Sequence, residues 1–195
     1  MSETERRYIK MQDMKTREAG DGKRYLEGYF SVFNSPYDIC AGWVETIAPG
    51  AFARYLSEGG GTKALWNHDS NIVLGSTANN TLTLREDETG LWGSIEINEA
   101  DTEALNAYAR VSRGDVEGCS FGFDIARQEE WWDDDGVYHT VIREVDPLYE
   151  VSPCTFPAYS ATSIEARSME RLEQARAKRR EAWRSEMIKR LKGDN

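Results

Sequence analysis

The 195 residues carry a net charge of −10 and are 39% hydrophobic and 30% charged, which is typical of one folded domain with an appendage. No apolar run approaches the roughly 18 residues of a membrane-spanning helix, and the polar N-terminus lacks the apolar segment of a secretion signal. Residues 168–195 contain nine Lys/Arg and five Asp/Glu, so the preceding 167 residues carry −14. An acidic body argues against nucleic-acid binding, which needs clustered cations.

Short strand-like segments separated by turns make up the first half of the chain. A loosely alternating strand is predicted within residues 8–18, and Asp21-Gly22 predicts a hairpin turn. Residues 51–58 predict a short helix that ends at three glycines. Further strands are expected at residues 24–32, 43–47, 62–67, 72–77, 81–86 and 90–97.

The second half of the body repeats this pattern. A helix is predicted over residues 101–113, with Asp101 as its N-cap and Gly114 at its end. Strands follow at residues 117–128, 136–144 and 148–154, with a turn at residues 131–136. Many short strands and two helices predict a mainly β fold of the α+β class, with a β-barrel flanked by helices.

The C-terminal segment has a different character. From Ser163 the chain has no Gly or Pro until Gly193 and is rich in Ala, Glu, Arg and Leu, which favour a helix. Its apolar residues are too sparse for a core helix. We therefore divide the chain into a barrel domain, residues 1–167, and a charged helical tail, residues 168–195, that serves as a docking or processing segment.

Two histidines are present, and histidine alone has an ordinary pKa suited to proton transfer near neutral pH. His68 follows a predicted strand at a turn, where the sheet can fix the side chain and the loop keeps it accessible. A surface loop histidine without a function fits the same position.

A second candidate lies in the strand that begins the last third of the body. Alternation places Cys119, Phe121 and Phe123 on one face, which we expect to pack inward, and Ser120 and Gly122 on the open face. Gly122 would leave room there for the backbone of another chain. A serine becomes a nucleophile when a neighbouring base removes its proton. An ordinary strand serine is the alternative.

Glu150 is an acidic residue in the apolar stretch 148–158. A buried carboxylate needs a partner. A histidine ring would be one, and the carboxylate would fix its tautomer and stabilise its charged form. The exposed face of a half-buried strand fits Glu150 equally well.

Five segments in this order resemble the prohead proteases of tailed bacteriophages. The similarity extends over residues 8–167, and the segments are residues 28–34, 45–52, 66–69, 119–123 and 150–159. The family is related in fold to the herpesvirus assemblins, whose barrel carries a serine and two histidines, so the resemblance implies a barrel here too. By motif match it assigns Ser120 as nucleophile and His68 as general base. Glu150 is our choice for the third member, with Asp146 and His139 as alternatives.

The resemblance implies a serine endopeptidase that cleaves scaffold and capsid protein segments during prohead maturation. It further implies self-cleavage, action inside assembling proheads in the host cytoplasm, and a homo-oligomer such as a dimer. The rival hypothesis is a non-enzymatic capsid assembly or scaffolding protein on the same barrel. Hydrogen-bond contact between Ser120 and His68 would separate the two.

We expect no cofactor and no metal. The acidic run Asp133-Asp134-Asp135-Gly136 lacks the spaced ligands of a calcium loop, so we interpret it as a solvated turn. The three cysteines are not closely paired, which indicates buried thiols in a reducing compartment rather than a disulfide framework. No membrane contact is expected.

Overall fold

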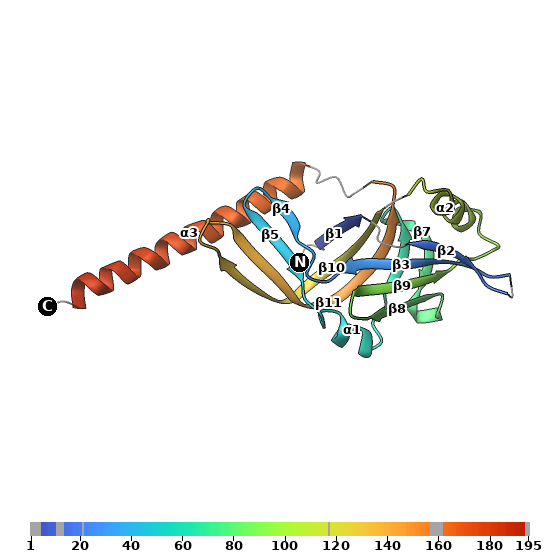
Figure 1. Cartoon of the computed structure of the whole chain (residues 1–195), viewed down its shortest axis with the longest axis horizontal. Helices are drawn as coiled ribbons and strands as arrows, with labels where there is room; N and C mark the ends of the chain where they lie inside the picture. Colours follow the sequence, from blue (N-terminus) through green and yellow to red (C-terminus); the bar gives the residue numbers. More distant parts are fainter. Residues whose placement is uncertain (1–4, 11–13, 21, 117, 157–161, 194–195) are drawn as a thin grey trace.

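Over the residues that it describes, the computed structural model of the protein consists of strands with three α-helices and one 3-10 turn (Figure 1). The structure describes residues 5–10, 14–20, 22–116, 118–156 and 162–193. The strands are β1 Glu5–Lys10, β2 Lys15–Glu18, β3 Arg24–Val32, β4 Tyr37–Cys40, β5 Trp43–Ile47, β6 Lys63–Trp66, β7 Asp69–Ser76, β8 Leu82–Glu86, β9 Gly90–Glu96, β10 Gly118–Trp132 and β11 Tyr138–Cys154. The helices are α1 Ala53–Ser57, α2 Thr102–Arg113 and α3 Thr162–Gly193, and the 3-10 turn is Thr77–Asn79.

The strands form two sheets. One has seven strands, in the order β1-β10-β11-β5-β4, with β6 pairing both β11 and β7. The other has four strands in the order β2-β3-β9-β8. Every pairing is antiparallel except those of β11 with β5 and β6. The α+β class is therefore confirmed, but within the described ranges the hydrogen-bonded strands form two sheets and not one closed barrel.

One hydrophobic core lies between the two sheets. Phe30 of β3 and Ile95 of β9 come from the smaller sheet, and Phe121 and Val151 from the larger. All four are completely buried, so each sheet presents its alternate apolar residues to the other. This shared core holds β10 and β11, the strands that carry Ser120 and Glu150, in a fixed position.

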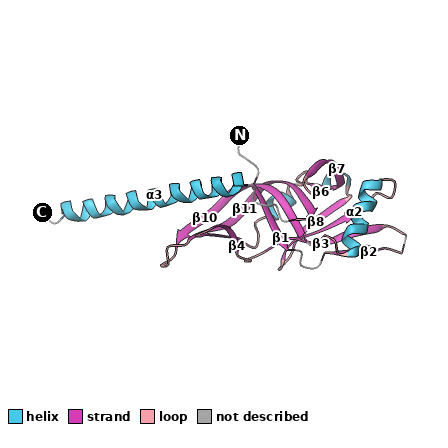
Figure 2. Cartoon of the chain, turned by 90° about the horizontal axis from the view of Figure 1, so that it is seen from above, coloured by secondary structure: helices cyan, strands magenta, loops and turns pink. Residues whose placement is uncertain are grey.

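A long antiparallel hairpin of β10 and β11 runs through the molecule (Figure 2). The segments predicted at residues 136–144 and 148–154 are one continuous strand, β11, and β10 extends to Trp132. Pro147 does not end strand β11. The pairing shifts register opposite Pro147, between Phe123 and Ile125, and such a bulge tolerates a residue without an N–H. The opening strand predicted within residues 8–18 overlaps the end of β1 and the whole of β2, and its residues 11–13 lie outside the described residues. Strand β4 was not predicted.

The helices follow their sequence signals closely. Asp101 caps α2 by accepting a hydrogen bond from the Glu103 N–H at 2.9 Å, and Gly114 ends it at φ 83°. Helix α3 projects away from the sheets (Figure 1). Leu172, near its beginning, is completely buried against Trp43 and Tyr138. Among the described residues, no helix is both long enough and apolar enough to cross a membrane.

Candidate active site

His68 lies in the two-residue turn between β6 and β7. Trp66 and Asp69 pair across this turn, and Asn67 and His68 both have positive φ, at 52° and 63°. Positive φ at both central residues is the geometry of the type I′ hairpin turn, which asparagine tolerates well.

Asn67 attaches this turn to the end of β11. Its N–H donates to the Pro153 carbonyl at 3.1 Å, and its side-chain oxygen accepts from the Thr155 N–H at 2.8 Å. Its side-chain amide donates to Thr155 Oγ1 at 3.2 Å. The histidine turn is therefore fixed to the strand that carries Glu150.

The other candidate residues share one face of the β10–β11 hairpin. Ser120 pairs across the strands with Ser152, and Gly122 pairs with Glu150. Directly opposed residues point to the same side of a sheet. The opposite face of β10 carries the predicted inward residues Cys119, Phe121 and Phe123, all completely buried. Ser120 is completely buried as well, so the open serine face that we expected is covered.

Glu150 connects these residues to the histidine. His68 Nδ1 lies 2.6 Å from Glu150 Oε1, and Ser152 Oγ donates to Glu150 Oε2 at 2.5 Å. When the carboxylate is ionised and the ring neutral, this contact places the ring proton on Nδ1 and leaves Nε2 with its lone pair. The Glu150 side chain is 9% exposed and that of His68 14%, so this pair is shielded from water.

Two polar atoms of this site, Ser120 Oγ and His68 Nε2, are buried and have no hydrogen-bond partner among the residues that the structure describes. The contact between them that we expected is therefore not made in this conformation. Catalytic hydrogen bonds are often loose before substrate binds. The two atoms left without partners are the ones that proton transfer from a serine to a histidine requires.

Gly122 makes room for the Glu150 carboxylate. A Cβ added at Gly122 would lie 2.8 Å from Glu150 Oε1. We expected this space to admit another chain's backbone, but a side chain of the neighbouring strand occupies it. Ser152, for which we predicted no role, also touches the carboxylate. Its position two residues after Glu150 on the same strand was the available signal.

The alternatives to Glu150 lie elsewhere. Asp146 is bound to Arg54 of α1. His139 Nε2 lies 2.8 Å from Asp133 Oδ2, and its ring stacks on Trp131 near the turn of the hairpin, away from Ser120. Of the three candidates, the structure brings only Glu150 into contact with His68.

The cysteines and the acidic turn at residues 133–136, the remaining candidates, lie in environments that give them structural roles. Cys119 is completely buried, and this burial raises the pKa of its thiol well above the ordinary value, so the thiolate is disfavoured. Burial also raises the pKa of Cys154 to about 12. Asp133 lies in a tight turn, where it accepts a hydrogen bond from the Val137 N–H at 2.8 Å. The described residues include no group of three or more acidic, histidine or cysteine side chains placed to hold a metal.

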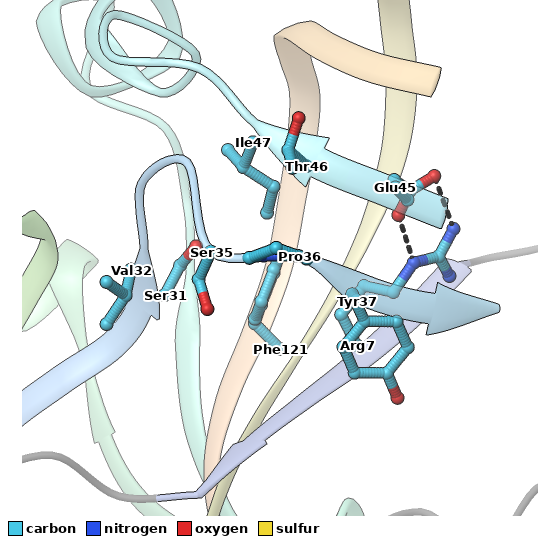
Figure 3. A pocket seen from close by; sticks show the side chains of 10 residues that line it. All are labelled: Arg7, Ser31, Val32, Ser35, Pro36, Tyr37, Glu45, Thr46, Ile47 and Phe121. Atoms are coloured by element: carbon cyan, nitrogen blue, oxygen red, sulfur yellow. Dashed lines mark hydrogen bonds and ion pairs between the residues drawn. The ribbon is translucent and has the colours of Figure 1, made fainter. Parts of the chain in front are cut away.

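A small pocket lies on the other side of β10 (Figure 3). Phe121 lines it together with Arg7 and Glu45. Because Phe121 and Ser120 are adjacent on one strand, their side chains point to opposite faces. This pocket is therefore separate from the candidate site.

Comparisons with known proteins identify the family of this chain. A family model described as caudovirus prohead serine protease matches residues 11–175. The chain is 34% identical over 166 residues to the prohead protease of Enterobacteria phage HK97, spanning 80% of this chain and 67% of that protein. The capsid assembly protease of bacteriophage T4 superposes with a TM-score of 0.40 at 10% identity, over 77% of this chain and 94% of that one. Since the family model spans most of its length, this chain belongs to the caudovirus prohead serine protease family.

Proposed function

We propose that the chain is a serine endopeptidase in which Ser120 is the nucleophile, His68 the general base and Glu150 the residue that orients His68. One observation carries this proposal: Glu150 holds His68 Nδ1, while His68 Nε2 and Ser120 Oγ are both buried without partners. This is the set of atoms that an activated serine requires.

The reaction would proceed by acyl transfer. Ser120 Oγ attacks the peptide carbonyl carbon as His68 Nε2 takes the serine proton. His68 then gives this proton to the leaving amine, and the peptide C–N bond breaks to leave an acyl-serine ester. Water, deprotonated by His68, hydrolyses the ester and restores the serine. Glu150 stabilises the charged ring, and the bond from Ser152 keeps the carboxylate in place.

The substrates follow from the family. The HK97 relative, which is a third identical to this chain, is a prohead protease. We infer that this chain cleaves segments of its own phage's scaffold and capsid proteins inside assembling proheads of the host, and also itself. A role as a non-enzymatic assembly protein is the competing hypothesis.

The test is Ser120→Ala in protein co-expressed with the capsid and scaffold proteins of the same phage. We expect processing to stop while the fold is retained, because the hydroxyl has no partner to lose. Ser31→Ala is the matched control, since Ser31 is also buried with an unpartnered hydroxyl. Normal processing by Ser120→Ala would refute the nucleophile and favour the non-enzymatic role.

A further inference from the structure

Ser120 has strand β1 directly beside it. Tyr8 of β1 is the cross-strand partner of Ser120, on the side of β10 opposite to Ser152. The pairing of β1 with β10 runs from Glu5 opposite Phe123 to Lys10 opposite Gly118. The serine strand is thus flanked on both sides by strands of its own chain, and an incoming peptide finds no open edge next to Ser120.

Of the two strands beside β10, only β1 can be displaced without removing residues of the candidate site. Strand β11 carries Glu150 and Ser152, and it pairs on its other side with β5 and β6. Strand β1 has six residues and lies at the edge of the sheet, where it pairs with β10 alone. Removing β1 would expose the main-chain groups of β10 on both sides of Ser120 along the strand.

Charged side chains hold the beginning of β1. Arg7 makes a buried two-pronged contact with Glu45 of β5, in which Nη2 donates to Oε2 at 3.1 Å and Nε donates to Oε1 (Figure 3). Glu5 accepts from Arg7 Nη1 at 2.9 Å and from Arg171 of α3 at 2.6 Å. Although burial alone would raise it, the pKa of Glu5 is lowered because Arg7 and Arg171 favour its charged form. Side chains that lie before residue 8 therefore fix the strand's register.

An exposed strand edge is a general site for extended peptides. A peptide that adds to a sheet edge gains main-chain hydrogen bonds whatever its side chains are. Neighbouring strands lie about 4.7–4.9 Å apart, and a serine side chain stands out of the plane of the sheet. A peptide in the place of β1 would run beside Ser120, and its scissile residue would bend toward the serine face to bring the carbonyl carbon within reach.

We propose that the edge of β10 covered by β1 is the substrate-binding site, and that an extended segment of the substrate binds there in place of β1. This proposal rests on Ser120 being the nucleophile. Strand β1 then competes with the substrate, and the apparent affinity for a peptide equals the intrinsic affinity multiplied by the fraction of molecules in which β1 is released.

A disulfide between β1 and β10 tests this proposal, because Ile9 pairs directly with Cys119. Paired residues of antiparallel strands lie about 4.5–5.5 Å apart at Cα, within the range that a disulfide spans. The variant Ile9→Cys would be oxidised, and the link between the introduced thiol and Cys119 confirmed by mass spectrometry of the digested protein. We expect cleavage of a peptide spanning a mapped capsid cleavage site to fall more than about tenfold on oxidation and to return on reduction. Ile9→Cys with Cys119→Ala, which cannot form the link, is the control.

Proline variants provide the opposite perturbation. Alternate residues of β1 direct their N–H groups toward β10, so either Tyr8→Pro or Ile9→Pro removes a hydrogen bond of this pairing. The disrupted variant should cleave the peptide faster, with a lower KM. The proposal is overturned if the cross-linked protein is as active as its reduced form, or if neither proline variant is faster. Ser120→Ala in the same series separates the two ideas: residual cleavage there would refute the nucleophile itself.

Discussion

Gly122→Ala is the smallest substitution that should disturb the contact between Glu150 and His68. The added Cβ would lie 2.8 Å from Glu150 Oε1 and 3.3 Å from its Cγ. Gly122 does not have a positive φ, so alanine fits the backbone and the steric conflict falls on the carboxylate.

The size of the effect follows from these distances. To reach ordinary contact at 3.4 Å from 2.8 Å, Oε1 must withdraw by about 0.6 Å. Withdrawal along its bond to His68 Nδ1 would lengthen that bond from 2.6 Å to about 3.2 Å, the upper limit of a good N–H···O hydrogen bond. A misplacement of about 1 Å in an active site can cost about 10²-fold in rate. We therefore expect kcat/KM to fall about tenfold, or about 1.4 kcal/mol on the barrier.

The assay is cleavage of a peptide spanning a mapped capsid site, with kcat and KM determined separately. The loss should appear in kcat, because the proposed mechanism has His68 act in the chemical step and gives Gly122 no part in holding the peptide. Gly61→Ala is the control, since Gly61 has no neighbouring atom within 4 Å of an added Cβ and no positive φ. Wild-type kcat in Gly122→Ala, with the fold intact, would show that Glu150 does not position His68.

Two further predictions concern the proton relay and the tail. Glu150→Gln should slow cleavage less than His68→Ala does, because in the proposed mechanism Glu150 only orients the ring whereas His68 moves the proton; equal rates for Glu150→Gln and wild type would contradict the role proposed for Glu150. Leu172→Ala should lower the free energy of unfolding by about 2–5 kcal/mol, because Leu172 is completely buried against Trp43 and Tyr138. Leu191→Ala in the same helix should be neutral in thermal unfolding, since Leu191 is 79% exposed. Equal effects of the two leucine variants would mean that α3 does not dock on the sheet.

Local signals predicted most of the elements of this fold. The strand at residues 24–32 was predicted with its observed bounds because alternating large residues bury one face. Asp101 and Gly114 defined α2, since a side-chain cap and a left-handed end need only nearby residues. The four-residue β4 was missed because its pairing with β5 stabilises it more than its own short pattern does. The distribution of strands over two sheets depends on long-range pairing, which no local pattern reveals.

The candidate residues were identifiable from motifs, but their arrangement was not. The three residues Ser120, His68 and Glu150 are far apart in the sequence. Only the resemblance to the phage proteases indicated that they lie close together in the fold. Burial of Ser120 by neighbouring strands could not be predicted, because the loose alternation of residues 8–18 does not reveal that β1 pairs with β10 while β2 pairs with β3. The hydrogen bond from Ser152 to Glu150 also depends on side-chain rotamers, which a sequence pattern does not specify.

The candidate site is assembled from two hairpins, β6–β7 and β10–β11. The contacts between these hairpins determine how His68 is placed relative to Ser120 and Glu150. The β10–β11 hairpin supplies Ser120 and Glu150 at fixed cross-strand positions, so their relation is set by the sheet itself. His68 comes from the separate β6–β7 hairpin, whose turn is fixed to the end of β11 by the hydrogen bonds of Asn67 with Pro153 and Thr155. Glu150 lies only a few residues before these two anchor points, so His68 and its carboxylate partner are both attached to one short stretch of the chain. Because an active site loses rate steeply with sub-ångström displacement, fixing both groups to the same few residues lets the rest of the sheet move without disturbing their contact.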